Sequence, residues 1–375
     1  MKVLFISHEA RRNGAPIALL QELRWLKEKC PDVSADILVL NDGPLVEDFA
    51  VWGRVIKGWN PFVSFINRAL RILRIRVFLN WYHFLLLEKY NCIYANTVVS
   101  LQAGCYLKRR LGVPLILHVH EAECLMHSFK LSPVTISAVD SFITVSNMAA
   151  DNLVNNYGAP SKAIKIQLPI SFWVDKYQRG EVEIEPFQYD NDVFLVGCFV
   201  DSGWFKSLEL LPIVLRNLFF RYPLINCKIA LIGDVDDEVR WRLNFEFKKI
   251  GCEDKVLWLG RVKEPLNYHA RFDVLLLLSR EESFSLVAQE SAIMGTPLIG
   301  FHATTGIEEW IGDMGGKWCS YGDIDAMADN IYQLYKDRDL RMVMGNMAKT
   351  IVLDMCEKSM NMEPVISTIY QYAER

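Results

Sequence analysis

The sequence predicts an α/β protein made of two Rossmann-like domains, each with a doubly wound parallel sheet. Short, continuous apolar runs recur along the chain, and several are followed by a segment with apolar residues at helical spacing. Such runs are typical of strands buried on both faces, as in parallel sheets. The alternation begins twice, at Lys2 and again at Val193. With 375 residues, the chain is long enough for two domains of this kind.

The composition is that of a packed globular protein, with 51% hydrophobic and 23% charged residues. No apolar run is long enough to span a bilayer, and the one nearest Met1 is too short for a secretion signal. The nine cysteines include no CxxC pair, which favours reduced thiols. We therefore expect a cytoplasmic protein, and nothing in the composition indicates a nucleic-acid partner.

The net charge of −4 is distributed unevenly. The first 175 residues carry 19 Lys and Arg against 14 Asp and Glu, whereas the remainder carries 22 against 31. A basic N-terminal half suits an anionic membrane surface or a phosphorylated acceptor. Ordinary scatter between two domains explains the same totals.

The N-terminal half opens with a buried strand from Lys2 to Ser7 and an amphipathic helix from Ile17 to Lys29. Gly14, in the loop between them, would let the backbone approach a ligand closely, and the alternative is an ordinary turn glycine. No GxGxxG follows the strand, so a dinucleotide site is not supported. Further elements are expected at Asp36–Leu40, Cys92–Asn96, Pro114–His120, Ser141–Ser146 and Ile164–Pro169 as strands, and at Asn147–Tyr157 as a helix.

A basic, aromatic-rich segment runs from Pro61 to Tyr90. Its clustered cations are Arg68, Arg71, Arg74 and Arg76. An amphipathic helix of this composition is a candidate for lying in a membrane interface, which would place the protein on the inner face of the membrane. The alternative is a helix of the domain with an apolar inner face.

The strand that ends at His120 continues into the motif HVHEAE. Its histidines and carboxylates, with His127, raise the question of a metal site. The later strand ends offer no comparable set of histidines, so we do not expect a metal. His118 is expected to be a buried neighbour of His120, and a core position is the alternative for His120 itself.

The C-terminal half repeats the pattern after a stretch without periodicity, from Ser171 to Asp192, that we interpret as a linker. Strands are expected at Val193–Phe199, Cys227–Gly233, Lys255–Val262, Val274–Leu278 and Pro297–Phe301. Helices are expected at Glu238–Ile250, Leu286–Met294, Asp325–Tyr335, Asp339–Met355 and Pro364–Arg375, the last crossing back to the N-terminal domain.

The most informative stretch is the polar loop between Leu278 and the helix that begins near Leu286. Ser285 is a suitable N-cap residue, and the backbone N–H groups at the helix start suit an anion such as a diphosphate. These N–H groups belong to Phe284, Ser285, Leu286 and Val287. The flanking carboxylates, Glu282 and Glu290, would repel a diphosphate but can accept hydrogen bonds from sugar hydroxyls. Together these groups describe a site for a nucleotide sugar, whereas two glutamates alone would be ordinary solvated residues.

The string from Glu282 to Pro297 resembles the E-x7-E region of retaining GT-B glycosyltransferases of family four. The segment from Val196 to Leu211 is similar to that family's glycine-rich loop, with Lys206 at the position of the diphosphate-binding lysine. This loop departs from the family pattern at three positions, Val200, Phe205 and Ser207. A second cation is therefore missing nearby, and Arg280 is a speculative substitute.

The resemblance implies a GT-B fold, with an N-terminal acceptor-binding domain at 1–172, a C-terminal donor-binding domain at 173–359 and a final helix at 360–375 that packs back on the first domain. The two domains would face one another across a cleft. His120, Lys206 and Glu282 would be catalytic. Donor contacts would come from Gly14, Arg261, Val262, Phe284, Ser285, Leu286, Val287 and Glu290, and weaker acceptor contacts from Asn96, Thr97 and Glu121.

The expected activity is transfer of a sugar from a nucleotide-sugar donor to a saccharide or lipid-linked saccharide acceptor, in bacterial surface polysaccharide biosynthesis. Retention of anomeric configuration is implied by the family. No cofactor and no metal are expected, because Lys206 and the helix start would balance the diphosphate charge. Alternatives are a non-catalytic partner subunit, which the altered Lys206 loop favours, and another GT-B enzyme such as a sugar-nucleotide epimerase. A phosphorylase would need a motif that is absent from the sequence.

Overall fold

The computed structural model describes residues 1–12, 14–58 and 88–373. The chain divides into two compact units, of which unit 1 comprises Met1–Leu168 with Ser359–Arg375 and unit 2 comprises Pro169–Lys358. The sequence placed the first division four residues later than the structure does, after residue 172. The basic segment with Arg68, Arg71, Arg74 and Arg76 lies outside the described residues.

Unit 1 is built on a parallel sheet with the strand order β3-β2-β1-β4-β5-β6-β7. The strands are β1 (Lys2–Ser7), β2 (Ser34–Val39), β3 (Arg54–Lys57), β4 (Cys92–Asn96), β5 (Leu115–Val119), β6 (Ser141–Thr144) and β7 (Ile164–Ile166). β4 and β5 are neighbours in this order, with Asn96 in register with His118. Polar residues at the ends of these two strands are therefore brought together.

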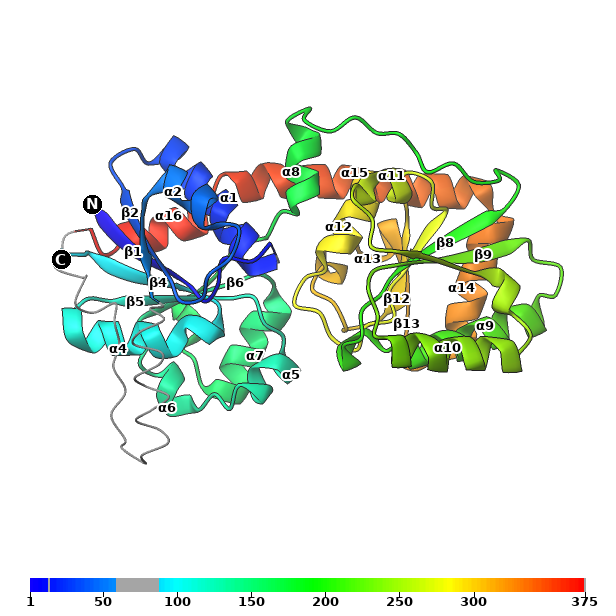
Figure 1. Cartoon of the computed structure of the whole chain (residues 1–375), viewed down its shortest axis with the longest axis horizontal. Helices are drawn as coiled ribbons and strands as arrows, with labels where there is room; N and C mark the ends of the chain where they lie inside the picture. The colour runs from blue at the N-terminus through cyan, green and yellow to red at the C-terminus, as the bar shows by residue number, and fades with distance from the viewer. Residues whose placement is uncertain (13, 59–87, 374–375) are drawn as a thin grey trace. The chain divides into compact units, whose positions relative to one another are not determined.

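Helices cover both faces of this sheet (Figure 1). They are α1 (Gly14–Lys29), α2 (Val46–Trp52), α4 (Leu101–Leu111), α5 (Glu123–Ser128), α6 (Pro133–Ile136), α7 (Asn147–Tyr157) and α16 (Glu363–Tyr370). Side chains of α4, α5 and α7 pack with those of the strands in one apolar cluster. The last helix, α16, lies against β6 and β7, where the Tyr372 and Ser141 hydroxyls are 2.7 Å apart and Lys165 donates to Ser367 at 2.6 Å.

Unit 2 contains a second parallel sheet, with the order β10-β9-β8-β11-β12-β13. Its strands are β8 (Phe194–Phe199), β9 (Cys227–Ile232), β10 (Val256–Gly260), β11 (Val274–Leu276), β12 (Leu298–Phe301) and β13 (Gly316–Cys319). The order reverses between β8 and β11, and ligands bind at such a reversal in open α/β sheets. The predicted fold class, two Rossmann-like parallel-sheet domains, is confirmed.

The helices of unit 2 also lie on both faces of its sheet (Figure 1). They are α8 (Phe172–Gln178), α9 (Leu211–Arg221), α10 (Asp237–Lys249), α11 (Pro265–His269), α12 (Leu286–Ile293), α13 (Glu308–Gly315), α14 (Ile324–Lys336) and α15 (Arg338–Met360), the last continuing to the boundary of the unit. α9, α10 and α14 share one apolar cluster with the strands. The segment predicted as a linker is partly helical, because α8 occupies its first third.

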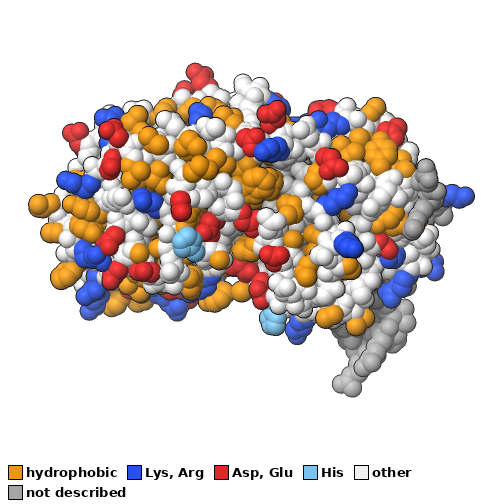
Figure 2. All heavy atoms as spheres, turned by 180° about the vertical axis from the view of Figure 1, so that it is seen from behind, with side chains coloured by type: hydrophobic (Ala, Val, Ile, Leu, Met, Phe, Trp, Pro, Cys, Tyr) orange, Lys and Arg blue, Asp and Glu red, His pale blue; other side chains and the backbone are white. Residues whose placement is uncertain are grey.

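None of the helices in the described residues is long and apolar enough to cross a membrane. On the face shown in Figure 2, acidic and basic side chains are interspersed over the surface.

Candidate active site

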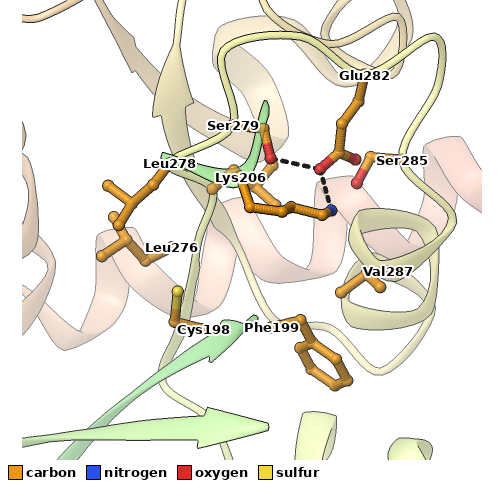
Figure 3. Close-up of a pocket in the computed structure, with 10 residues that line it drawn as sticks. Cys198, Phe199, Lys206, Leu276, Leu278, Ser279, Glu282, Ser285 and Val287 are labelled. Atoms are coloured by element: carbon orange, nitrogen blue, oxygen red, sulfur yellow. Dashed lines mark hydrogen bonds and ion pairs between the residues drawn. The ribbon is translucent and has the colours of Figure 1, made fainter. Parts of the chain in front are cut away.

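Lys206 and Glu282 meet in unit 2, beyond the carboxyl ends of β8 and β11. Lys206 closes a 3-10 turn, η4 (Trp204–Lys206), that follows β8, and Glu282 lies in the loop after β11. The Lys206 ammonium is 2.5 Å from Oε1 of Glu282, and the hydroxyl of Ser279 donates to the same oxygen at 2.5 Å. Figure 3 shows the lysine side chain extending across the site to this carboxylate. Two predicted residues that are 76 positions apart are thus in direct contact.

Both members of this pair are charged in the folded protein. Burial alone would raise the pKa of Glu282, but the charge of Lys206 and hydrogen bonds from Lys206 and Ser279 lower it below the usual value. Burial alone would lower the pKa of Lys206, and the nearby Glu282 carboxylate raises it instead. The site therefore holds a positive charge that is fixed in place before any ligand binds.

The pair borders a small hollow in unit 2 (Figure 3). Its lining includes Phe199, Lys206, Ser279, Glu282, Ser285 and Val287. Lys206, Glu282, Ser285 and Val287 were all predicted as site residues. The structure therefore brings one cation, one carboxylate and the start of a helix to the same place.

The start of α12 carries no side-chain cap. Ser285 occupies the N-cap position with a left-handed backbone (φ 74°), and its hydroxyl does not cap the helix, so the prediction of a serine cap is wrong. The carbonyl of Ser285 accepts from Gln289, and the carbonyl of Phe284 accepts from Ile307. Among the described residues, the N–H groups of Leu286 and Val287 have no hydrogen-bond acceptor, as is common at a helix start.

Glu290 is buried within unit 2 and is not part of the lining of the hollow. Its Oε1 accepts a hydrogen bond from the hydroxyl of Ser171, and its Oε2 lies 3.6 Å from Nε2 of His269. The neighbouring Gln289 accepts from the Ser171 backbone N–H at 2.7 Å and donates to Pro169 at 3.1 Å. Glu290, inside α12, therefore contacts Ser171 and does not line the hollow with Glu282.

The remaining predicted donor contacts of unit 2 also lie outside the hollow. Arg261 is exposed and 3.5 Å from Asp234, Val262 is half-buried, and Phe284 is buried. The guanidinium of Arg280 bonds to the Trp204 carbonyl and to Glu209, and it lies 4.4 Å from the centre of the Trp204 ring. Arg280 thus holds the turn that carries Lys206 and does not act as a second free cation.

In unit 1, Asn96 and His120 are in contact at the ends of β4 and β5. Oδ1 of Asn96 is 2.8 Å from Nε2 of His120, and its Nδ2 donates to the carbonyl of Ala15 at 2.9 Å. Burial, together with His118 and His8, lowers the pKa of His120 well below the usual value, so the imidazole is neutral at neutral pH. Ala15 follows Gly14 in the first turn of α1, where a methyl group on Gly14 would meet nothing within 4 Å.

The other two predicted acceptor contacts are buried in the same region. Thr97 has a left-handed backbone (φ 84°), donates its N–H to the His118 carbonyl at 2.8 Å and lies 3.3 Å from His8. One carboxylate oxygen of Glu121 accepts from the N–H groups of Val98 and His120. Burial nevertheless raises the pKa of Glu121 to about 7.

A buried network behind His120 was not predicted. The Tyr94 hydroxyl donates to Glu22 at 3.1 Å and lies 2.7 Å from Nδ1 of His118, and this nitrogen is 3.3 Å from the other oxygen of Glu22. Glu22 comes from α1 and Tyr94 from the middle of β4, where the sequence reads as ordinary amphipathic helix and buried strand. Ser279 and Ser171 were missed for the same reason, since a serine in a loop carries no signal of its partner.

The described residues contain no group of three or more histidine, cysteine, aspartate or glutamate side chains that could hold a metal ion. The expectation of a metal-independent reaction stays a prediction.

Comparisons with known proteins match both units. The family model described as Glycosyltransferase Family 4 matches residues 13–168, and the one described as Glycosyl transferases group 1 matches residues 189–351. The N-acetyl-alpha-D-glucosaminyl L-malate synthase of Bacillus anthracis is 38% identical over 132 residues, which are 35% of this chain and 34% of that protein. The match thus spans about a third of the length of that relative.

Two further relatives cover more of the chain. The D-inositol 3-phosphate glycosyltransferase of Paenarthrobacter aurescens is 23% identical over 281 residues, 70% of this chain and 68% of that protein. The crystal structure of Anabaena HepE in complex with UDP superposes with a TM-score of 0.70 at 18% identity, covering 100% of this chain and 99% of that one. Together with the two parallel sheets, these matches show that the chain belongs to the GT-B glycosyltransferases of group 1 and family 4.

Proposed function

We propose that the protein is a retaining glycosyltransferase that moves a sugar from a nucleotide-sugar donor to a saccharide or lipid-linked saccharide acceptor. The observation that carries the proposal is the contact between Lys206 and Glu282 beside the uncapped start of α12. A fixed cation and free backbone N–H groups suit a diphosphate, and a carboxylate suits sugar hydroxyls. The hollow in unit 2 offers all three.

In this proposal, Lys206 and the N–H groups of Leu286 and Val287 stabilise the charge that develops on the leaving nucleoside diphosphate. The diphosphate would share the ammonium of Lys206 with Glu282, whose second oxygen then accepts from a hydroxyl of the transferred sugar. Ser279 keeps Glu282 oriented while its partner changes. No metal is needed for these steps, because the counter-charge belongs to the protein.

His120, in unit 1, would act as a neutral hydrogen-bonding group toward a sugar hydroxyl. Gly14 would let the start of α1 approach the donor, and Glu121 would contact the acceptor. The region around Arg261 and Val262 would border the nucleotide base. Glu290 would accept from a donor hydroxyl through Oε2, because Ser171 occupies Oε1.

The names of the relatives reduce the range of candidate donor molecules. Anabaena HepE has been solved with UDP and with UDP-glucose, and the Bacillus anthracis relative is named for an N-acetylglucosaminyl product. We therefore propose a UDP-activated hexose or N-acetylhexosamine as the donor. We also propose a role in bacterial surface polysaccharide biosynthesis and a location in the cytoplasm. There the protein would dock on an anionic membrane through Arg68, Arg71, Arg74 and Arg76. An Arg-to-Glu variant of these four should lose flotation with anionic liposomes.

The test is a thermal-shift screen of UDP-, GDP-, dTDP- and CDP-sugars with the wild type and with Lys206→Ala. A donor at about 100 times its Kd stabilises the folded state by about 2.7 kcal/mol, and the variant should lose this shift. The donor that passes is then incubated with saccharide acceptors in EDTA, and the anomeric configuration of the product is read by proton NMR. If the protein binds a donor but neither transfers the sugar nor slowly hydrolyses the donor, the hypothesis of an enzyme is refuted and the non-catalytic partner subunit remains.

The partner-subunit alternative has one observation in its favour. Ser207 and Ser285 both adopt left-handed backbones (φ 52° and 74°), at positions where the family commonly has glycine. Left-handed backbone at a residue with a side chain costs about 1 kcal/mol, so both loops are less free to adjust around a donor.

A further inference from the structure

The orientation of the Asn96 side chain determines which nitrogen of His120 carries a proton. Asn96 is fully buried at the end of β4. Its amide nitrogen must face the Ala15 carbonyl, 2.9 Å away, because a carbonyl can only accept. The amide oxygen therefore faces His120 Nε2 at 2.8 Å, and since this oxygen can only accept, Nε2 must donate.

The adjacent His118 is held the other way. The Tyr94 hydroxyl gives its hydrogen to Glu22, so its oxygen accepts from Nδ1 of His118 at 2.7 Å. A second acceptor, Oε1 of Glu22, lies 3.3 Å from the same nitrogen. The two imidazole rings are 4.0 Å apart between centres and tilted by 36°. Two neighbouring histidines of one strand end are thus fixed with opposite nitrogens protonated.

We propose that Asn96 is a positioning residue that fixes His120 as the Nε2–H tautomer, and that Glu22 and Tyr94 fix His118 as the Nδ1–H tautomer. The role assigned to Asn96 in this way replaces a direct contact with the acceptor. In the fixed tautomer, Nδ1 of His120 is a hydrogen-bond acceptor, the partner that a sugar hydroxyl needs. The functional consequence rests on the proposed function, whereas the tautomers themselves do not.

A tautomer is decided by the geometry only while the ring is neutral. The titratable groups that face His120 are His118 on its own strand, His8 after β1 and the adjoining Glu121, whose carboxylate accepts from the His120 backbone. Burial and the two histidines act against a second proton on the ring. Exchanging the neutral amide of Asn96 for a carboxylate would act in favour of one. The residue at position 96 therefore controls which nitrogen of neutral His120 is protonated and the pH at which the ring takes up a second proton.

The experiment is histidine nitrogen NMR of the full-length protein, which has seven histidines, with His120→Gln used to assign the resonance. The wild type should show His120 protonated at Nε2 and not at Nδ1. Asn96→Leu, of similar size, should give a mixed or reversed tautomer. Asn96→Asp should keep the proton on Nε2. In this variant, the His120 ring should stay doubly protonated up to a pH at least one unit higher than in the wild type.

Asn152→Leu is the matched control, because Asn152 is also buried in unit 1 but donates to Met126. It should perturb folding to a similar degree and leave the His120 spectrum unchanged. With a donor identified, Asn96→Leu should lower kcat at least tenfold with less than a threefold change in donor KM. Asn96→Asp should move the acidic limb of the kcat profile upward by the shift seen in the spectrum.

The wild-type spectrum tests the proposal even if Asn96→Leu fails to fold. His120 protonated at Nδ1 in the wild type, an unchanged tautomer in a folded Asn96→Leu, or an equal change in Asn152→Leu would overturn it. These readouts need no substrate. Absence of sugar transfer by the wild type would refute the proposed function alone.

Discussion

Lys206 and Ser279 donate to the same oxygen of Glu282, each at 2.5 Å. The lysine comes from the turn after β8 and the serine from the loop after β11. The two side chains together hold one carboxylate at the point where the strand order of unit 2 reverses. A donor diphosphate that binds here competes for a cation that already has a partner.

Lys206→Met should destabilise unit 2 by about 3 kcal/mol at neutral pH, because it leaves a largely buried carboxylate without its counter-charge. The pKa of Glu282 is lowered in the folded protein, so the stability from this pair is present above pH 4.5 and is lost as the pH falls through the folded pKa. The difference in free energy of unfolding between the wild type and Lys206→Met should therefore become smaller at acidic pH. Chemical denaturation at pH 7 and at a series of pH values below 4.5 measures this difference between variant and wild type.

A second substitution separates the lost pair from lost packing. Lys206→Met combined with Glu282→Gln should be more stable than Lys206→Met alone. Lys358→Met is the control in the same unit, where an exposed lysine pairs with Asp354, and it should cost less than about 1 kcal/mol. Equal stability of the single and double Lys206 variants would mean that the ion pair contributes nothing.

Lys206→Ala should lower kcat/KM, because the leaving diphosphate loses its fixed cation. The expected loss of transition-state stabilisation is about 2–4 kcal/mol. Steady-state kinetics with the donor found in the screen measures the loss. Activity within twofold of the wild type would remove Lys206 from the mechanism.

Glu121→Gln should weaken the dependence of stability on pH. The pKa of Glu121 is raised from 4.5 to about 7 by burial, so the folded state holds this proton more tightly than the unfolded state. The wild type consequently loses stability as the pH rises from 4.5 through 7, by about 3 kcal/mol from this group. The variant should be the more stable protein at pH 8. Chemical denaturation between pH 5 and 8 measures this, with the exposed Glu123→Gln as control; parallel curves for Glu121→Gln and the wild type would contradict the assignment.

Gly14→Ala should fold as well as the wild type and bind the donor at least tenfold more weakly. The added methyl group meets nothing within 4 Å, and alanine favours the helix by up to about 1 kcal/mol. Gly43→Ala is the contrasting control, since its methyl group would lie 2.2 Å from the Ala10 carbonyl and should destabilise unit 1. Melting temperatures and donor titration measure the two effects. Unchanged donor affinity in Gly14→Ala would mean that this glycine does not adjoin the ligand.

Ser171→Ala should cost about 2 kcal/mol, because Ser171 both caps α8 and donates to the buried Glu290. Ser146→Ala removes a serine cap that α7 uses in the same way, with no carboxylate of the described residues bonded to it, and it should cost about 1 kcal/mol. The difference, from chemical denaturation, is the contribution of the contact with Glu290. Equal costs would show that Glu290 gains nothing from Ser171.

The fold followed from local sequence features, whereas the placing of Lys206 in one site with Glu282 followed from the family resemblance. Buried strands and amphipathic helices have distinct periods, and polar residues after parallel strands meet at one edge of the sheet. Helix α8 was not predicted, because its residues show no clear hydrophobic period. It is stabilised by contacts of Ser171 with Gln289 and Glu290, which lie 118 and 119 positions away in the chain.

The side-chain partners in the site depend on geometry that spacing does not specify. Asn96 was predicted as an acceptor contact because it ends a strand, yet the adjacency of β4 and β5 places it against His120. Glu290 was predicted to flank the ligand with Glu282, and in the structure its carboxylate accepts from Ser171 and is not part of the lining of the hollow. Ser285 was predicted as a cap, and the left-handed backbone that the loop imposes keeps its hydroxyl from the helix.

The residues from Ser359 to Arg375 belong to unit 1, although all of unit 2 precedes them in the chain. Removal of Ser359–Arg375 would leave unit 2 intact but would take α16 from β6 and β7, together with the contacts of Tyr372 with Ser141 and of Ser367 with Lys165. The first sheet therefore depends on residues that a whole folded unit separates from it along the chain.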